Sequence, residues 1–400
     1  MPETQPPESW GAGPERRTAR CWHGTAWLVW LVPMLVITVL VIARPERRTV
    51  TPLYHAAVEC WWHRQPLYSG PAGMNYLPHF AVLFTPYHLA GRVLGDLFWR
   101  WTAAGGLAAG LWLFCGALAG RDRLRAFVVV SALSLPLSLP ALQNGQANAQ
   151  LAAAFLLAGW FLQAQGWGTA VLFLGLATCI KPLGLAAMAL AWAVEPRLWW
   201  RLACGLVVFV GLPFLAGPPG YVADQYLAAA ENLRQCAVVT EHRFADLNGL
   251  LRTLGIPLTG TAATGARALA GVGLMFLCRG AARREPGPIR ALVWLSVTAA
   301  FLMLFNPMTE ANSYVILAPA LALVAWHELS RGARWLGWLL VAMALTMGLL
   351  PNALHPFLDN RFALVWHPAM TLAFVGVIVG RFARRDPRKP RPEQARDGSP

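Results

Sequence analysis

The sequence predicts an all-α polytopic membrane protein, and its composition and charge pattern both support this class. Hydrophobic residues make up 56% of the 400-residue chain and charged residues only 13%, with a mean hydropathy of +0.46. A soluble domain has nearer 25% charged residues. The arginines gather in short segments between apolar runs that are long enough to cross a bilayer. This distribution follows the positive-inside rule, so the net charge of +14 reflects membrane topology rather than nucleic-acid binding.

We predict about twelve transmembrane helices in a single domain, residues 24–380, with both termini in the cytoplasm. A polar cytoplasmic segment, 1–23, precedes the first span, which is too long for the core of a signal peptide. The basic, Pro-rich tail, 381–400, is expected to be disordered and cytoplasmic. The first three expected spans cover 24–43, 97–119 and 126–142, and the next four end near 161, 180, 194 and 216. The eighth covers 261–278, the following three end near 305, 326 and 350, and the twelfth covers 362–380.

Two large segments between spans are expected on the outer face, residues 44–96 and 217–260. In the first outer loop, the stretch Tyr54–Trp62 reads as an amphipathic helix that lies on the membrane interface. Residues 80–94 could form a span. We predict a second interfacial helix instead, because an extra span here would move most of the loop arginines to the outer side.

Lys181 is the only formally charged residue between Ala126 and Val194, and the chain has one other lysine, Lys389. A lysine near the middle of a bilayer costs roughly 2.5–3.5 kcal/mol on insertion scales. Pro182 follows and breaks the helical hydrogen-bond ladder. Lys181 therefore reads as a cation at a helix break that faces a cavity and binds an anion such as phosphate. The alternative is a lysine that snorkels at the end of a span.

The uncommon polar residues fall at the expected outer ends of the spans. They lie near Glu59, at 75–79, at 143–148, at Lys181, in 217–260 and at 306–314. Amides, carboxylates and aromatic faces together are suited to a sugar, and a cation is suited to its phosphate. The hypothesis at this point is a site for a phosphorylated sugar, with a sideways opening that would admit a lipid-linked substrate.

An ordered set of short motifs carries a resemblance to a known family. The set is Tyr54, Pro66-Leu67-Tyr68, Tyr76-Leu77-Pro78, Gly145-Gln146-Ala147-Asn148 and Ile180-Lys181-Pro182. In order and spacing it resembles glycosyltransferase family 87 over roughly residues 25–325. These membrane enzymes have the GT-C fold and include mannosyltransferases that use polyprenol-phosphate-mannose.

The resemblance implies sugar transfer from a polyprenyl-phosphate donor on the non-cytoplasmic face. It also implies that Gln146, Asn148 and Lys181 lie near the donor. One departure stands out, since the family's pattern has an aspartate a few residues before Tyr54. This chain reads Thr49-Val50-Thr51-Pro52 there and offers no acid.

The reaction still calls for a carboxylate that takes the proton of the acceptor hydroxyl. Glu310 and Glu59 are the candidate catalytic bases. In each case the alternative is a solvated glutamate with no catalytic role. His55 and His79 could share the function, or they could be structural histidines beside aromatic rings.

For the donor's phosphate and sugar, we predict a binding set of polar and aromatic side chains on the outer face: Lys181, Gln146, Asn148, Tyr76, His79, Asn312 and Tyr314. Gln146 and Asn148 could instead cap the start of a helix, because Asn is a favoured N-cap residue. The sequence shows no clustered acidic or cysteine metal motif. We therefore predict no metal and no other cofactor.

The predicted function is a hexosyltransferase, with mannose as the favoured sugar and a lipid, glycan or protein as the acceptor. The predicted location is the bacterial inner membrane. Two other hypotheses stay open. A transporter or flippase of a lipid-linked or anionic solute would use the same cation and broken helices, although 126–194 offers almost no polar path through the bilayer. A relative that binds glycolipid without turnover would fit the missing aspartate.

Overall fold

The computed structural model describes residues 14–69, 74–236, 244–358 and 361–382, and no strand occurs in these ranges. The all-helical prediction is therefore confirmed for this part of the chain. Most of the predicted segments 1–23 and 381–400 lies outside the described residues. The α-helices are α1 (Pro14–Ala43), α2 (Thr51–Trp62), α3 (His79–Leu89), α4 (Arg92–Ala119), α5 (Arg123–Asn144), α6 (Asn148–Gln163), α7 (Trp167–Ile180), α8 (Gly184–Val194), α9 (Trp199–Gly211), α10 (Pro219–Cys236), α11 (Leu247–Thr253), α12 (Gly260–Arg284), α13 (Gly287–Phe305), α14 (Ala318–Ser330), α15 (Arg334–Leu358) and α16 (Arg361–Phe382).

Four short 3₁₀ helices complete the described elements, and each continues or joins longer helices. They are η1 (Gly120–Asp122), η2 (Pro196–Leu198), η3 (Leu212–Leu215) and η4 (Ala311–Ile316). The last of these, η4, leads from the loop after α13 into α14. It therefore sets the direction in which the residues that follow this loop point.

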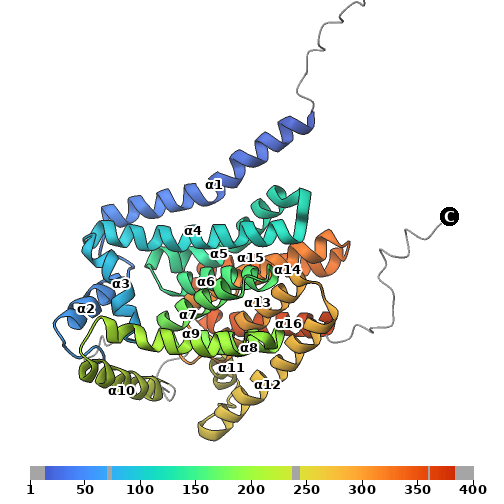
Figure 1. The fold of residues 1–400 in the computed structure, drawn as a ribbon. Coiled ribbons are helices and arrows are strands. Elements are labelled where there is room, and N and C mark those ends of the chain that lie inside the picture. The colour runs from blue at the N-terminus through green and yellow to red at the C-terminus, as the bar shows by residue number, and fades with distance from the viewer. Residues whose placement is uncertain (1–13, 70–73, 237–243, 359–360, 383–400) are drawn as a thin grey trace, which may run out of the picture.

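The long helices lie side by side in a bundle whose centre holds α6, α13 and α14 (Figure 1). These three helices are apolar around their whole circumference, which is the pattern of a helix buried on all sides. Most residues of α13 are buried, including Trp294. In contrast, α12 buries only Cys278 and Ala281, and its large apolar side chains Leu269, Val272 and Phe276 are exposed. The centre of the bundle is thus a protein core, while α12 presents the surface expected of a helix in contact with lipid.

Six helical stretches are long and apolar enough to cross a membrane, judged by length and composition among the described residues. They are Arg92–Asn144, Pro196–Leu215, Gly260–Arg284, Gly287–Phe305, Arg334–Leu358 and Arg361–Phe382. Shorter apolar helices, among them α7 and α8, cover other predicted spans. These findings support an integral membrane protein, and the count of twelve spans stays a prediction.

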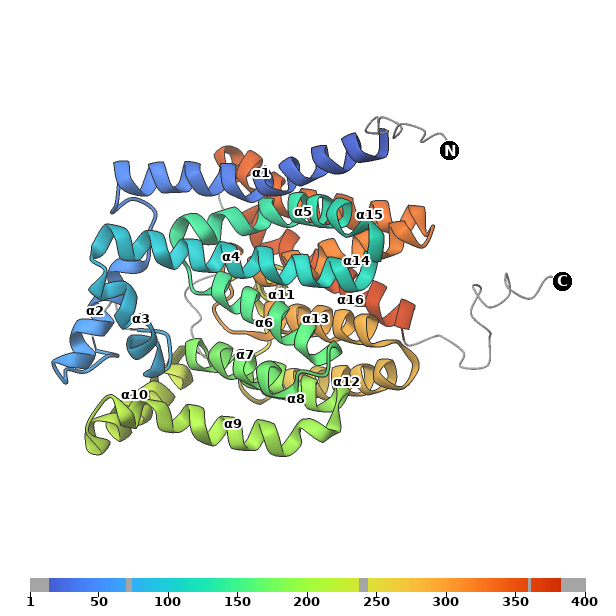
Figure 2. The ribbon, with the colours of Figure 1, turned by 45° about the horizontal axis from the view of Figure 1, so that its top comes forward.

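Helices α2, α3 and α10 cap one end of the bundle (Figures 1 and 2). Two short helices were expected in the first outer loop, and α2 and α3 lie there. The expected helix over 80–94 is shorter than predicted, because α3 ends at Leu89 and α4 begins at Arg92. Gly95 permits this tight corner, since a Cβ atom at that position would lie 1.8 Å from the Tyr87 carbonyl oxygen.

The connections rich in arginine lie at the opposite end of the bundle (Figure 2). They join α4 to α5, α8 to α9, α12 to α13 and α14 to α15. The first turn of α1 and the last turn of α16 lie at this end as well. Polar loops and basic loops are therefore separated along the bundle axis, and the site described next lies at the capped end.

Candidate active site

One cavity of about 240 Å³ lies at the capped end, beneath α2 and α10. Its walls come from six stretches that are far apart in the sequence. Lining residues belong to 50–54, 74–76, 146–148, 181–183, 232–236 and 306–313. Five of the six stretches overlap segments in which polar residues were predicted to gather on a single face, and the stretch 50–54 was not among them. The alternating direction of the helices brings these loops together.

Lys181 supplies the cation of this cavity. It follows the last residue of α7 in an extended conformation, with φ −140° and ψ 145°, as expected for a residue that precedes proline. Its Nζ donates a hydrogen bond of 2.9 Å to Asn148 Oδ1 and lies 5.1 Å from the centre of the Tyr76 ring. The group that accepts this hydrogen bond is therefore a neutral amide and not a carboxylate.

Burial lowers the pKa of Lys181 to about 8, and the Glu310 carboxylate opposes this shift. Near neutral pH the side chain therefore carries a positive charge, and no acid among the described residues contacts it. A site of this kind attracts an anion, because anion binding offsets the cost of burying the ammonium group.

Asn148 fixes Lys181 from the first turn of α6. Its Oδ1 accepts the lysine hydrogen bond, and its Nδ2 donates to Ser313 Oγ over 3.0 Å. Both ends of the amide are therefore used, which determines its orientation. The alternative that Asn148 caps a helix does not apply, since the N-cap is Ala147 and Asn148 is the first helical residue.

Glu310 is the carboxylate of the cavity, and its side chain is exposed there. Gln146 Nε2 donates a hydrogen bond of 3.0 Å to Glu310 Oε2. The amide of Gln146 is buried, and its Oε1 has no hydrogen-bond partner among the described residues. A carboxylate held at one oxygen and open to the cavity is suited to accept a proton from a bound hydroxyl.

Two tyrosines line the same cavity. Tyr76 and Tyr54 share a hydrogen bond of 2.8 Å between their hydroxyl groups, and Tyr54 Oη accepts a bond of 3.2 Å from the backbone N–H of Ala147. Burial raises the pKa of Tyr76 to about 12, so its phenol stays protonated. The Tyr76 ring also stacks on Phe80 at 4.4 Å between centroids. Tyr76 is thus a rigid, neutral wall beside the lysine.

Four other predicted site residues do not line the cavity. Glu59 is exposed on α2. His79 is buried, and its Nε2 lies 2.7 Å from the Phe209 carbonyl oxygen. Tyr314 is buried with its hydroxyl donating to the Ala245 carbonyl over 2.8 Å. Asn312, on η4, is absent from the cavity wall. Of the predicted set, Lys181, Gln146, Asn148, Tyr76 and Glu310 are brought together.

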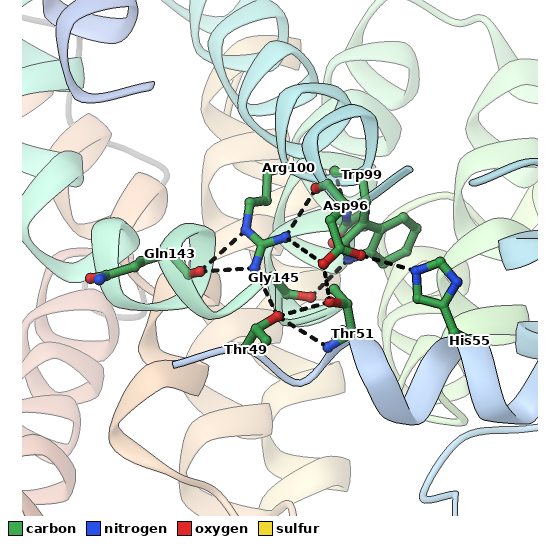
Figure 3. A network of polar contacts seen from close by, with 9 residues as sticks. Thr49, Thr51, His55, Asp96, Trp99, Arg100, Gln143 and Gly145 are labelled. Carbon is green, nitrogen blue, oxygen red and sulfur yellow. Dashed lines mark hydrogen bonds and ion pairs between the residues drawn. The ribbon is translucent and has the colours of Figure 1, made fainter. Parts of the chain in front are cut away.

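A buried ion pair beside the cavity was not predicted from the sequence. Asp96 and Arg100, one turn apart at the start of α4, are both almost fully buried. Asp96 accepts a hydrogen bond of 2.5 Å from Thr51 and lies 3.1 Å from His55 (Figure 3). An acid thus approaches the stretch 49–52 after all, from α4. The signal in the sequence was an Asp and an Arg at i, i+4 spacing at the start of an apolar helix.

The fold and the cavity define an integral membrane protein whose polar site is assembled from the loops between apolar helices. The model of glycosyltransferase family 87 matches residues 75–307, more than half of the chain. The chain belongs to this family, which is one of glycosyltransferases. No curated protein matches the chain. Among the described residues, no three His, Cys, Asp or Glu side chains gather as a metal site would require.

Proposed function

We propose that this protein transfers a hexose, mannose in the first instance, from a polyprenyl-phosphate carrier to a hydroxyl group of a lipid, glycan or protein acceptor. One observation carries the proposal. Lys181, which among the described residues donates to a neutral amide, and Glu310, an open carboxylate, line the same cavity of a chain that belongs to a glycosyltransferase family. A cation for a leaving phosphate and a base for an attacking hydroxyl are the two groups this reaction needs.

Lys181 would bind the donor phosphate. When the bond between the sugar C1 and the phosphate oxygen breaks, its electron pair stays on the polyprenyl phosphate, which gains negative charge. A fixed ammonium group stabilises that charge more in the transition state than in the ground state, so it lowers the barrier. Asn148 would hold the lysine in place through the 2.9 Å hydrogen bond.

Glu310 would act as the base. The acceptor oxygen forms the new bond to C1, and its proton passes to the Glu310 carboxylate. Gln146 would orient that carboxylate through the 3.0 Å hydrogen bond. Tyr76 offers a flat aromatic face on which a sugar ring could lie. Lys181 and Tyr76 would thus act on the donor, and Glu310 would act on the acceptor.

The shape of the cavity supports a lipid-linked donor. Its volume of about 240 Å³ is below the roughly 300–1,000 Å³ of pockets that enclose a whole drug-sized ligand. Only a head group would fit inside, and a long chain would lie outside. Leu53 and Leu233 line the cavity and are 43% and 37% exposed. These side chains would offer an apolar path for the prenyl chain toward the bilayer.

The finer topology belongs to the proposal as well. We place the capped end on the non-cytoplasmic side of a GT-C-like bundle with about twelve spans and both termini in the cytoplasm. The basic connections would then lie inside, as the positive-inside rule requires. The bacterial inner membrane is the proposed location.

The first test is a transfer assay with the chain in membranes, a labelled polyprenyl-phosphate hexose and a panel of acceptor lipids. Wild-type protein should transfer label, and Glu310→Gln should lose at least 100-fold in kcat. Glu59→Gln is the matched control, because it makes the same change at an exposed glutamate outside the cavity. It should stay within twofold of wild type. Full activity of a stable Glu310→Gln protein would remove Glu310 as the base.

A second pair of variants tests the cation. Lys181→Gln should raise the donor KM and lower kcat, while Lys389→Gln, at the chain's other lysine, should change neither. If wild-type membranes give no transfer with mannose or glucose donors, a liposome assay of labelled-lipid movement would test the flippase hypothesis. Binding of the lipid without movement or transfer would favour a relative that only binds.

A further inference from the structure

The Asp96–Arg100 pair lies outside the cavity wall, yet it contacts the turn that carries two cavity residues. The side chains of Arg100 and Asp96 are only 1% and 4% exposed. The Asp96 carboxylate is fully engaged, since Oδ2 accepts from Thr51 and lies 3.7 Å from Arg100 Nη1, and Oδ1 lies 3.1 Å from His55 Nε2. An acid so enclosed is not placed to take a proton from a substrate.

Arg100 uses its donors on the end of α5 and on the entry to α2. Its Nε and Nη2 donate to the Gln143 carbonyl oxygen over 3.2 Å and 3.1 Å, and Nη2 also donates to Thr49 Oγ1 over 2.9 Å (Figure 3). A planar guanidinium group can make these bonds at once, because its donors point in fixed directions. Arg100 therefore joins three elements: α4, the end of α5 and the start of α2.

The next two carbonyls at the end of α5 are also bound from outside the helix. The backbone N–H of Val50 donates to the Asn144 carbonyl over 3.0 Å, and Trp99 Nε1 donates to the Gly145 carbonyl over 2.8 Å. The last carbonyls of a helix lack partners within it and are the groups that a neighbouring element can fix. Here three successive carbonyls, at 143, 144 and 145, are fixed by α4 and by the residue before α2.

The fixed turn leads directly to the cavity. Gly145 adopts a left-handed conformation with φ +65°. Gln146 follows and donates to Glu310, and Asn148, two residues further on, accepts from Lys181. A rotation of this turn would move the contacts of the carboxylate and of the cation together.

We infer that Arg100, held by Asp96, is a positioning residue for sugar transfer: it fixes the turn after α5 so that Gln146 faces Glu310 and Asn148 faces Lys181. This inference rests on the proposed function. It goes further by assigning a role in the reaction to a pair that touches neither substrate. It also gives a role to a buried arginine beside an apolar core, where an unpaired charge would be costly.

The test uses Arg100→Lys, which keeps the charge and loses the planar set of donors. We expect kcat/KM for the donor to fall ten- to a hundredfold as Glu310 loses the Gln146 hydrogen bond. Arg123→Lys is the matched control. Arg123 also binds a backbone carbonyl, that of Trp112 over 3.0 Å, but at the opposite end of the bundle. It should leave the rate unchanged.

A double variant separates positioning from a general loss of structure. If Arg100 acts through Gln146 and Asn148, then adding Arg100→Lys to Gln146→Leu should lower kcat/KM by a smaller factor than Arg100→Lys does in the wild-type protein. Losses that multiply in full would overturn the inference while leaving the proposed function intact.

Hydrogen exchange gives a readout that needs no turnover. The backbone N–H of Gln146 donates to the Ala141 carbonyl, and that of Ala147 donates to Tyr54 Oη. Peptides that cover 143–150 should exchange at least tenfold faster in Arg100→Lys than in wild type or Arg123→Lys. Unchanged exchange would overturn the inference even if wild type proved inactive. If wild type proved inactive but Arg100→Lys still exchanged faster, the role of Arg100 in fixing the turn would stand and sugar transfer would be rejected.

Discussion

The side-chain amide of Gln146 donates a hydrogen bond of 3.0 Å to the carboxylate of Glu310, across 164 positions of sequence. This contact joins the turn between α5 and α6 to the loop between α13 and η4. It is the only hydrogen bond to the Glu310 side chain that the described residues make. The orientation of the carboxylate therefore depends on one amide.

Replacing Gln146 by leucine should lower the rate of transfer, because Glu310 would lose the hydrogen bond that orients it. A hydrogen bond to a charged group contributes about 1.5–3 kcal/mol, so kcat/KM should fall roughly 10- to 150-fold. Gln150→Leu is the control, because Gln150 donates to the Trp99 carbonyl and does not line the cavity. An unchanged kcat/KM in Gln146→Leu would contradict the role of this contact.

The pH dependence of kcat/KM for the donor should report the protonation state of Lys181. Its pKa lies at about 8, lowered by burial, so the cation is present below pH 8 and is lost as the pH rises through that value. We therefore expect kcat/KM for the donor to fall about tenfold per pH unit above pH 8. Lys181→Arg should retain a weaker activity and lose this limb, because a guanidinium group stays charged. The same limb in Lys181→Arg would assign the titration to another group.

Asn148→Asp should separate the pKa of the lysine from its affinity for phosphate. A carboxylate at the 2.9 Å contact stabilises the ammonium form, so the alkaline limb should move above pH 8. The added negative charge repels the donor phosphate, so the donor KM at pH 7 should rise, by about tenfold if the effect is near 1.4 kcal/mol. Asn232→Asp puts the same charge elsewhere on the cavity wall. It should raise KM and leave the limb in place.

The buried pair on α4 should dominate the stability of the capped end. Asp96→Asn leaves Arg100 as a buried charge without its acid, a change that costs about 3–5 kcal/mol. Denaturant unfolding in detergent would measure this loss. Asp122→Asn, at an exposed aspartate in η1, should change the free energy of unfolding by less than about 0.5 kcal/mol. Equal stability of the two variants would show that the pair contributes little.

Gly145→Ala should lower the free energy of unfolding by more than the cost of alanine in a left-handed conformation. Both Gly145 (φ +65°) and Gly120 (φ +53°) are left-handed, and alanine costs about 1–2 kcal/mol in that conformation. At Gly145 the new Cβ would also lie 2.8 Å from Thr51 and 3.0 Å from Arg100, whereas at Gly120 it would have nothing within 4 Å. Comparing unfolding free energies and transfer rates of the two alanine variants isolates the contact. Equal losses in both variants would mean that the contacts of the new Cβ atom with Thr51 and Arg100 cost no free energy.

Much of the cavity could be predicted because apolar helices that alternate in direction bring every second loop to the same end. Lys181, Gln146 and Glu310 are polar residues at the ends of such helices, so their loops had to meet. The rotation of each helix could not be predicted in the same way. Ser313 faces the cavity while Tyr314, its neighbour, turns into the core to bond Ala245, because successive helical residues point in different directions.

The contribution of α4 was missed for a similar reason. Its start was predicted at Leu97, which leaves Asp96 outside the helix and hides its one-turn spacing from Arg100. His79 was expected in the binding set as one of the polar residues of the segment 75–79. The start of α3 at His79 directs its side chain toward α9 and α10 instead, where Tyr226 contacts it at 3.0 Å. Side-chain direction at helix ends depends on tertiary packing, which a single sequence does not display.

The cavity extends past both limits of the family match. Tyr54 precedes residue 75, and Glu310 and Ser313 follow residue 307, whereas Gln146, Asn148 and Lys181 lie between them. A chimaera that receives 75–307 from another family member would thus combine a foreign cation and amides with the native carboxylate. Such exchanges would measure how strongly transfer depends on matching side chains between residues 75–307 and the rest of the cavity wall. Activity would return only where the incoming amide at position 146 meets the resident acid at 310.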